Sequence, residues 1–211
     1  MPEVQLSADN QTLSATLTIP AAARGLVIFA HGSGSGRKSP RNQFVATTLN
    51  KGGIATLLLD LLTADEEQVD NRTAELRFDI ALLARRVAGA AEWARAQKEV
   101  AALPIGYFGA STGAGAALVA AAQQKDIKAI VSRGGRPDLA VTALERVSAP
   151  TLLIVGERDP LVIDLNRQAA RHLLQSQIVI IPRATHLFEE AGALEQVAQL
   201  ASEWFARYLW V

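Results

Sequence analysis

Short apolar runs alternate along the chain with longer stretches in which apolar residues recur at helical spacing. The short runs predict strands at TLSATLTIP (12–20), GLVIFAH (25–31), GIATLLLD (53–60), PIGYFGA (104–110), IKAIVSRG (127–134), TLLIVGE (151–157) and QIVIIP (177–182). Several of these runs are apolar at successive positions, as in strands buried on both faces of a parallel sheet. TLSATLTI instead alternates and predicts an antiparallel edge strand with one face in water.

The longer stretches predict helices at residues 41–51, 73–98, 113–124, 138–146, 161–174 and 193–209. Strands that alternate with helices indicate an α/β fold, with a mostly parallel central sheet and helices on both of its faces. A chain of 211 residues without an internal repeat or a low-complexity linker fits one domain over residues 1–211. The polar stretch TADEEQVDNR (63–72) is expected to be a loop that crosses solvent.

The composition narrows the possible chemistry. Cysteine is absent and the three histidines are scattered, so we expect neither disulfides nor a metal site, and no cofactor. The 21 basic and 21 acidic residues balance, so no overall charge favours nucleic acid or an anionic membrane as a partner. The polar start MPEVQLSADN lacks the pattern of a signal peptide, and no apolar run reaches the roughly 18 residues of a membrane span. We therefore expect a cytoplasmic protein.

The stretch GASTG places Ser111 between a predicted strand and a predicted helix rich in small residues. This is the context of a nucleophile elbow, a sharp strand-to-helix turn that presents a serine hydroxyl. Gly109 and Gly113, two residues before and after Ser111, leave room for neighbouring backbone in such a turn. The alternative is that Ser111 is only the N-cap of a glycine-rich helix.

A serine nucleophile needs a base to take its proton and a carboxylate to orient that base. The chain supplies both in the order expected after this turn, with Asp159 in GERDP and His186 in ATHLF, each just beyond a predicted strand. The carboxyl ends of parallel strands meet at one edge of a sheet, so we expect these three side chains to converge. Taken singly, Asp159 could only start a turn or cap a helix, and His186 could be a solvated loop residue. Asp164 is the nearest substitute acid.

The loop HGSGSG follows the strand GLVIFA and is the candidate for an oxyanion hole. The backbone N–H groups of Ser33 and Thr112 are the predicted donors, and His31 and Gly34 are candidate substrate-binding residues beside them. The alternative is a phosphate loop, since GSGSGRKS contains glycines, a lysine and a serine. Its spacing argues against that alternative, because Arg37 stands where the phosphate-loop motif has glycine.

The motifs HGSGSG, GASTG, GERDP and ATHLF, in this order and each after a predicted strand, resemble those of the α/β-hydrolase family. The resemblance covers nearly the whole chain and is strongest to the small, cap-poor dienelactone hydrolase-like members. It implies an α/β-hydrolase fold with a minimal cap or none, and Ser111, Asp159 and His186 as a catalytic triad. Dienelactone hydrolases proper carry cysteine as the nucleophile, whereas this chain has serine, so a serine esterase or a related acyl hydrolase is expected.

The predicted activity is cleavage of a small-molecule ester, lactone or thioester through an acyl-enzyme on Ser111. Arg133 and Arg136 follow one strand and are candidates to bind an anionic group of the substrate, unless they are ordinary solvated loop charges. A different hypothesis is a non-catalytic binding protein or partner subunit with a vestigial triad. The protein is expected to be a monomer or a homodimer. Trp210 and Val211 are candidates for an exposed dimer contact, and the alternative is that they pack into the core.

Overall fold

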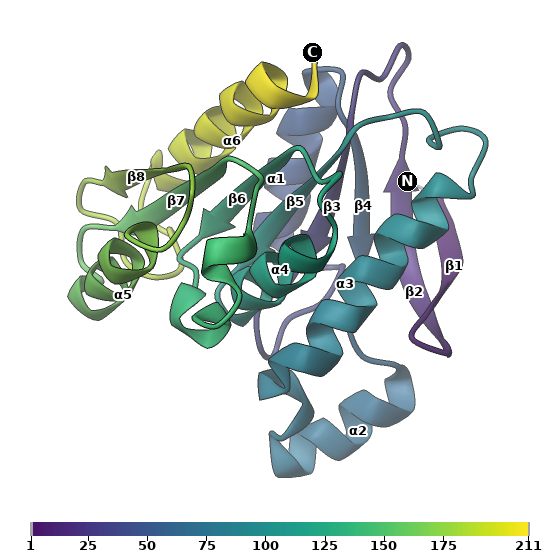
Figure 1. Cartoon of the computed structure of the whole chain (residues 1–211), viewed down its shortest axis with the longest axis horizontal. Helices are drawn as coiled ribbons and strands as arrows, with labels where there is room; N and C mark the ends of the chain where they lie inside the picture. The colour runs from purple at the N-terminus through teal and green to yellow at the C-terminus, as the bar shows by residue number, and fades with distance from the viewer. Residues whose placement is uncertain (1, 211) are drawn as a thin grey trace.

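A twisted eight-stranded sheet crosses the molecule, and helices cover both of its faces in the computed structural model, which describes residues 2–210 (Figure 1). The strands lie in the order β1-β2-β4-β3-β5-β6-β7-β8. β1 pairs with β2, and β2 with β4, in antiparallel register, and every other pair is parallel. The strand bounds are β1 Glu3–Ala8, β2 Gln11–Thr18, β3 Leu26–Ala30, β4 Ala55–Leu59, β5 Ile105–Ala110, β6 Ala129–Arg133, β7 Thr151–Gly156 and β8 Ser176–Ile181.

Helices α3 and α4 lie on one face of the sheet and helices α1 and α6 on the other (Figure 1). Helix α2 lies near the carboxyl ends of the strands, apart from both helical layers (Figure 1). The helix bounds are α1 Pro40–Lys51, α2 Ala64–Thr73, α3 Ile80–Arg95, α4 Thr112–Gln123, α5 Pro160–Ala170 and α6 Ala193–Leu209, with 3-10 turns η1 Leu76–Phe78, η2 Pro137–Ala140 and η3 Leu144–Arg146. None of the helices within residues 2–210 is both long and apolar enough to cross a membrane.

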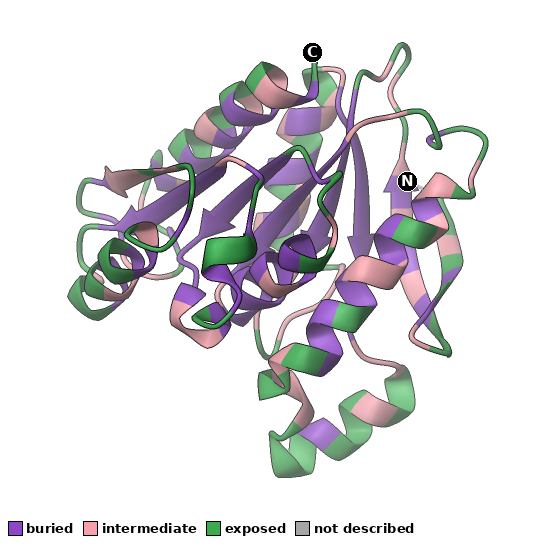
Figure 2. Cartoon of the chain, in the orientation of Figure 1, coloured by how far each residue is buried: buried purple, intermediate pink, exposed green. Residues whose placement is uncertain are grey.

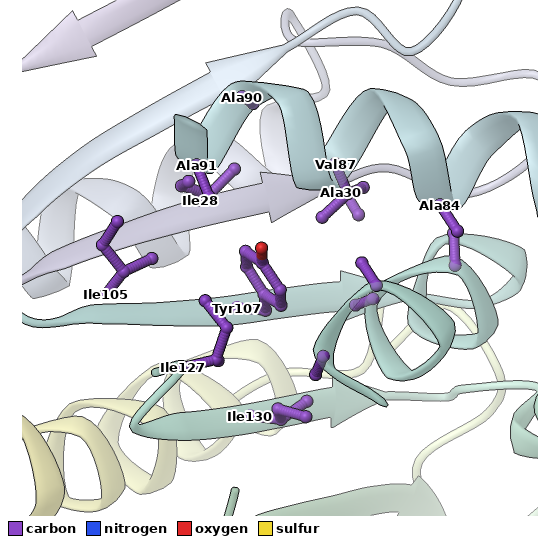
Figure 3. Close-up of a cluster of buried hydrophobic side chains, with 14 of the residues drawn as sticks. Ile28, Ala30, Ala84, Val87, Ala90, Ala91, Ile105, Tyr107, Ile127 and Ile130 are labelled. Carbon is purple, nitrogen blue, oxygen red and sulfur yellow. The ribbon is translucent and has the colours of Figure 1, made fainter. Parts of the chain in front are cut away.

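The sheet is buried on both faces because successive side chains of its parallel strands enter two different apolar layers (Figure 2). In β3, Ile28 faces the layer under α3 and α4, whereas Phe29 faces the layer under α1 and α6. Figure 3 shows the first layer around Tyr107 of β5, whose ring lies among aliphatic side chains of β3, β6 and α3. The Tyr107 hydroxyl donates a hydrogen bond to Gln124 at the end of α4, and burial raises its pKa. This close packing fixes the strand ends that carry the predicted site.

The predicted α/β fold with a mostly parallel sheet is confirmed, and all seven predicted strands are present. The alternating stretch at 12–20 is β2, which is antiparallel to both of its neighbours but lies one strand in from the edge. The edge strand is β1. The sequence did not predict it, because only Leu6 and Ala8 of this strand are buried and its other residues are mostly polar.

One loop prediction and two helix predictions need correction. The segment 63–72 is not a solvent-crossing loop but forms most of α2, whose polar sequence hides it because Asp70 is its only buried residue. The helix expected from residue 73 begins at Ile80, after Asp79 caps it. The segment 138–146 forms the turns η2 and η3 instead of one α-helix, although its buried residues Ala140, Ala143 and Leu144 keep the i, i+3, i+4 spacing that predicted a helix.

The carboxyl-terminal end of α6 is followed by Trp210, which is 38% exposed and packs its ring under the Arg24 guanidinium at 4.4 Å. This cation–π contact gives the ring a partner within the chain. Val211, the other residue of the predicted homodimer contact, lies outside the described residues.

Candidate active site

Ser111 occupies a sharp turn between β5 and α4. Its backbone has φ 50° and ψ −121°, a conformation that costs a non-glycine residue roughly 1–3 kcal/mol and persists only where the surroundings enforce it. Two backbone hydrogen bonds tie this turn to the loop after β6, from the Ser111 N–H to the Arg133 carbonyl and from the Arg136 N–H to the Ser111 carbonyl. The Ser111 hydroxyl makes no capping hydrogen bond to the described residues of α4, which leaves it free for another partner.

The two flanking glycines are required by close backbone contacts. A Cβ at Gly109 would lie 2.4 Å from the Ala114 Cα, inside the van der Waals distance. A Cβ at Gly113 would lie 2.3 Å from the carbonyl oxygens of both Ala30 and His31. The first turn of α4 therefore packs directly against the end of β3 and the loop that follows it.

The three residues of the predicted triad lie in contact. The Asp159 Oδ2 atom is 2.7 Å from the His186 Nδ1 atom, and the His186 Nε2 atom is 3.4 Å from the Ser111 Oγ atom. The second distance is longer than a strong hydrogen bond, as is common in active sites without substrate. Asp164, the substitute acid, lies on the exposed side of α5 within 3.6 Å of Arg167, so the acid beside His186 is Asp159.

The loop that carries His186 is held by contacts that the sequence did not reveal. The Thr185 N–H donates to both carboxylate oxygens of Glu190 at 3.1 Å, and hydrogen bonding from Thr185 lowers the Glu190 pKa. A Cβ at Gly156 would lie 2.4 Å from the Ala184 carbonyl oxygen, so β7 passes close beneath this loop. The available sequence signal was the acidic pair Glu189 and Glu190 directly after ATHLF, because a carboxylate four or five residues beyond Thr185 can accept a hydrogen bond from its backbone N–H.

The two predicted oxyanion donors lie side by side. The Ser33 N–H donates to the Thr112 Oγ1 atom at 2.9 Å, which joins the loop after β3 to the start of α4. Thr112 is the first residue of α4, so its own N–H has no acceptor inside the helix. A Cβ at Gly32 would lie 3.1 Å from the Ser111 Cβ, so this loop covers the nucleophile turn closely.

His31 uses both ring nitrogens to hold the same loop. Its Nδ1 atom lies 2.9 Å from the Gly32 carbonyl oxygen, and its Nε2 atom accepts the Leu61 N–H at 3.0 Å. Burial lowers the His31 pKa, which favours a neutral ring with its proton on Nδ1. The ring therefore has no free nitrogen for a substrate, although His31 does line the cleft described next.

A cleft with an empty volume of about 480 Å³ opens beside the Ser33 and Thr112 donors. One wall is the loop 31–35 and the other is the α2–η1 segment, including Asp70 and Arg77. The sequence missed this second wall because it predicted a loop where α2 lies. Gly34, with φ +66°, lies between the walls, and a Cβ there would be 3.9 Å from the Arg77 Nη1 atom.

The Arg77 side chain is fixed by Asp70. Its Nε atom lies 2.6 Å from the Asp70 Oδ2 atom and its Nη2 atom donates to the Asp70 carbonyl at 3.0 Å. Burial alone would raise the Asp70 pKa, but the hydrogen bonds and the positive charge of Arg77 outweigh burial and lower it. A second ion pair, between Arg86 of α3 and Glu66 at 2.8 Å, anchors the start of α2.

The arginines near the carboxyl edge differ in their partners. Arg136 forms a two-pronged hydrogen bond with Asp138, at 2.8 and 2.7 Å, which raises the Arg136 pKa and occupies its guanidinium edge. Arg37 pairs with Asp60 and Glu3. Arg133 is buried and forms no ion pair with the carboxylates of residues 2–210. Of the two arginines predicted to bind an anion, only Arg133 is without a carboxylate partner.

The phosphate-loop alternative is not favoured by the geometry of residues 32–39. The Arg37 N–H donates to the Asp60 Oδ1 atom at 2.7 Å, so this backbone amide already has a carboxylate acceptor and is not available to a phosphate. A Cβ at Gly36 would lie 2.8 Å from the same oxygen. The negative charge of Asp60 at this position would repel a phosphate group.

Within the described residues, no group of three or more histidines, aspartates or glutamates is arranged to hold a metal ion.

Comparison with known proteins identifies the family. Residues 23–203 match the family model described as "Alpha/beta hydrolase domain". A dienelactone hydrolase from Anabaena variabilis is 57% identical in structure-based comparison, with a TM-score of 0.97 over 99% of this chain and 97% of that one. Est1E from Butyrivibrio proteoclasticus is 18% identical with a TM-score of 0.82, covering 97% of this chain and 98% of that one, which supports the fold alone.

Curated relatives carry a different name. Two Mycobacterium tuberculosis proteins, each named "Putative phosphoribosyl transferase", are 54% identical over 209 residues. The match covers 98% of this chain but only 46% of those proteins, so the chain spans less than half of their length. The part that they share with this chain is the part described by the hydrolase family model. The chain therefore belongs to the α/β-hydrolase family, and within it is a dienelactone hydrolase-like protein.

Proposed function

We propose that the protein is a serine hydrolase that cleaves a small ester, lactone or thioester through an acyl-enzyme on Ser111. The observation that carries this proposal is the contact chain from Asp159 through His186 to the Ser111 hydroxyl at a strained turn. Strain of this kind concentrates at functional sites, and a buried serine N-cap would not need it. The similarity to a dienelactone hydrolase supports the same reaction class.

The proposed first half-reaction forms the acyl-enzyme. His186 Nε2 takes the proton of Ser111 as the Oγ atom attacks the carbonyl carbon of the substrate. The tetrahedral intermediate then collapses, and the leaving alcohol or thiol takes the proton from His186. Asp159 accepts the Nδ1–H hydrogen bond throughout, which keeps the proton of the neutral ring on Nδ1 and stabilises the imidazolium.

The second half-reaction reverses these roles. A water molecule gives a proton to His186 and attacks the acyl carbon, and the proton then returns to the Ser111 oxygen as the acid leaves. For a lactone, ring opening leaves the alcohol attached to the acyl group, so both halves of the product leave after this step. Apart from this water and the substrate, the proposed steps use only groups of the chain itself.

The proposed oxyanion hole is formed by the N–H groups of Ser33 and Thr112. The Ser33 N–H donates to the Thr112 hydroxyl, so it is already directed toward the start of α4. A substrate oxygen entering here would compete with that hydroxyl for the Ser33 N–H, while the Thr112 N–H is free to donate directly. Two such donors on fixed backbone are the usual means of stabilising the intermediate.

The proposed substrate is small. The cleft beside the proposed oxyanion donors has an empty volume of about 480 Å³, and residues of α2 and η1 form its outer wall. This favours a compact acyl or lactone group over a long acyl chain. The transferase name of the curated relatives belongs to proteins more than twice as long, and we do not propose that activity here.

Labelling with a fluorophosphonate probe tests the proposal. We expect wild-type protein to be labelled and the Ser111→Ala and His186→Ala variants to lose labelling and ester turnover by about 10³-fold or more. Ser202→Ala, which removes a hydroxyl from α6, is the matched control and should be labelled like wild type. Undiminished labelling of folded Ser111→Ala would refute the nucleophile. A folded wild type that neither labels nor turns over esters would favour the binding-protein hypothesis.

A further inference from the structure

The loop between β8 and α6 carries His186 and is anchored on both sides of it. Ala184, two residues before His186, is buried, and its carbonyl oxygen accepts the Arg158 N–H at 2.9 Å. Phe188, two residues after His186, is also buried and packs in the layer under α1 and α6. Because Arg158 directly precedes Asp159, the first anchor joins the backbone beside the acid to the backbone of the histidine loop.

The peptide group between Ala184 and Thr185 is held on both of its edges. Its carbonyl oxygen accepts the Arg158 N–H, and its N–H, which belongs to Thr185, donates to both carboxylate oxygens of Glu190 at 3.1 Å. A peptide group is planar, so hydrogen bonds on opposite edges fix its rotation. The group ends at the Thr185 Cα atom, one residue before His186, and its rotation therefore determines where the imidazole is directed.

The His186 imidazole has little tolerance for displacement. Its Nδ1 atom is 2.7 Å from the Asp159 Oδ2 atom, and its Nε2 atom is 3.4 Å from the Ser111 Oγ atom. Proton transfer requires a separation of roughly 2.6–3.2 Å, so the second distance must shorten when a substrate binds. A misplacement of about 1 Å at a reacting group can slow a reaction about 10²-fold. Among residues 2–210, the Thr185 N–H has no acceptor other than Glu190.

Glu190 is itself fixed and charged. Its carbonyl oxygen accepts the Ala193 N–H at 2.9 Å, which ties its backbone to the start of α6. Hydrogen bonding from Thr185, aided by the positive charge of Arg158, lowers the Glu190 pKa, so its carboxylate is ionised near neutral pH. Hydrogen bonds to an ionised acceptor are stronger than those between neutral groups. The neighbouring carboxylate of Glu189 is directed elsewhere, toward Arg41, and is 64% exposed.

We propose that Glu190 is a positioning residue for His186, whose carboxylate fixes the peptide group before the histidine and so aligns the imidazole between Asp159 and Ser111. The inference rests on the proposed hydrolase function, in which His186 carries the proton. Glu190 does not line the cleft beside the proposed oxyanion donors, so it acts through His186 and not on the substrate. Loss of its carboxylate should therefore lower kcat and leave KM nearly unchanged.

The kinetics of 4-nitrophenyl acetate hydrolysis test this role. Glu190→Ala should lower kcat by about 20-fold or more, with KM within about threefold of wild type. Glu190→Gln, whose carboxamide oxygen can still accept the Thr185 N–H, should keep kcat within about fivefold of wild type. Glu189→Ala removes the adjacent carboxylate, whose exposed ion pair contributes little, and is the matched control with wild-type kcat. Equal kcat values for Glu190→Ala and Glu189→Ala would overturn the proposal.

The folded fraction of each variant separates a positioning role from a structural one. Urea titration gives this fraction at the assay temperature, and kcat is then expressed per folded molecule. A loss of kcat that disappears after this correction would mean that Glu190 only supports the fold, and would overturn the proposal. Should Glu190→Ala fail to fold, Glu190→Asp keeps the charge but is one methylene too short to reach Thr185. Glu190→Asp should then lower kcat more than Glu190→Gln does, and the reverse order would overturn the proposal.

Proton NMR provides a readout that does not depend on turnover. The His186 Nδ1 proton lies in the short contact with Asp159 and should give a low-field resonance that Asp159→Asn removes. This resonance should shift or broaden in Glu190→Ala and stay as in wild type in Glu189→Ala. An unchanged resonance in folded Glu190→Ala would overturn the positioning role. If the wild type shows neither labelling nor turnover while the resonance responds to Glu190→Ala, the hydrolase function fails and the positioning of His186 by Glu190 stands.

Discussion

The cleft beside the proposed oxyanion donors has two walls that are held by different forces. The wall formed by Thr112 and the loop 31–35 lies against the Ser111 turn and depends on backbone contacts so close that Gly113 has no space for a methyl group. The α2–η1 wall buries only Asp70 from α2 and is attached by ion pairs, Asp70 with Arg77 and Glu66 with Arg86. The wall beside Ser111 is therefore fixed by shape, whereas the wall that faces it is fixed by charge.

The largest expected effect is on the shape-fixed wall. Gly113→Ala would place a Cβ 2.3 Å from two backbone oxygens and should cost about 3 kcal/mol or more of the free energy of unfolding, measured by urea titration. Gly115→Ala in the same helix is the control, because its closest contact is 3.0 Å and alanine favours the helix. Equal effects of the two substitutions would show that the close contact does not matter.

Removal of a charge should loosen the other wall alone. Asp70→Asn weakens the hydrogen bonds that hold Arg77 and should lower the local stability of α2 by about 2 kcal/mol. Hydrogen exchange should therefore accelerate over 64–78 but not over 105–123. Asp65→Asn, on the exposed surface of α2, is the matched control and should leave exchange nearly unchanged. Faster exchange in both walls would contradict their separate attachment.

Acid should distinguish the two walls in the wild-type protein. The folded Asp70 pKa is lowered below its unfolded value of about 3.9, so its stabilising effect is complete above that pH. As the pH falls through the lower folded pKa, the carboxyl is protonated and this stabilising effect is lost. Limited pepsin digestion should therefore cut α2 first below about pH 4. Asp70→Asn should lack this added acid sensitivity, and a wild type cut equally in β5 and α2 would count against the assignment.

The smallest expected effect is an increase in the stability of α2. Ala74, which ends α2, has φ 56°, a left-handed conformation that glycine adopts without strain. Ala74→Gly should stabilise the α2 wall by about 0.5–1 kcal/mol, visible as slower exchange in α2. Ala81→Gly, at an exposed position in α3, should destabilise by a similar amount. A loss of stability in Ala74→Gly would mean that the methyl group of Ala74 makes a contact that matters.

The same contrast explains what the sequence could predict. The sequence predicted the strands, the nucleophile turn and the order of Ser111, Asp159 and His186. Closely packed elements require apolar runs and small residues, and both are visible in the sequence. Helix α2 was missed because a helix attached by ion pairs leaves no apolar stripe. Its capping box, Thr63 with Glu66, was the available signal.

The arginines show a second limit of sequence analysis. Arg133 and Arg136 looked equivalent, since both follow the same strand. The structure separates them, because Asp138 lies two residues beyond Arg136 and turns back to it, while Arg133 enters the layer beneath α1. The sequence shows that both side chains are charged but not which guanidinium has a carboxylate partner, because that pairing depends on the path of the backbone after β6.

The two bonded nitrogens of His31 make the loop 31–35 sensitive to acid. Its pKa lies below the unfolded value of about 6.5, so the loop is fully supported above that pH and loses support as the pH falls through the folded pKa. A proton arriving at Nε2 would compete with the Leu61 amide for the same lone pair and detach the loop from the end of β4. The acid limb of a pH–rate profile would then include the loss of support for this loop. His31→Gln, whose side-chain oxygen can still accept the Leu61 N–H but does not titrate, would remove the His31 contribution to that limb.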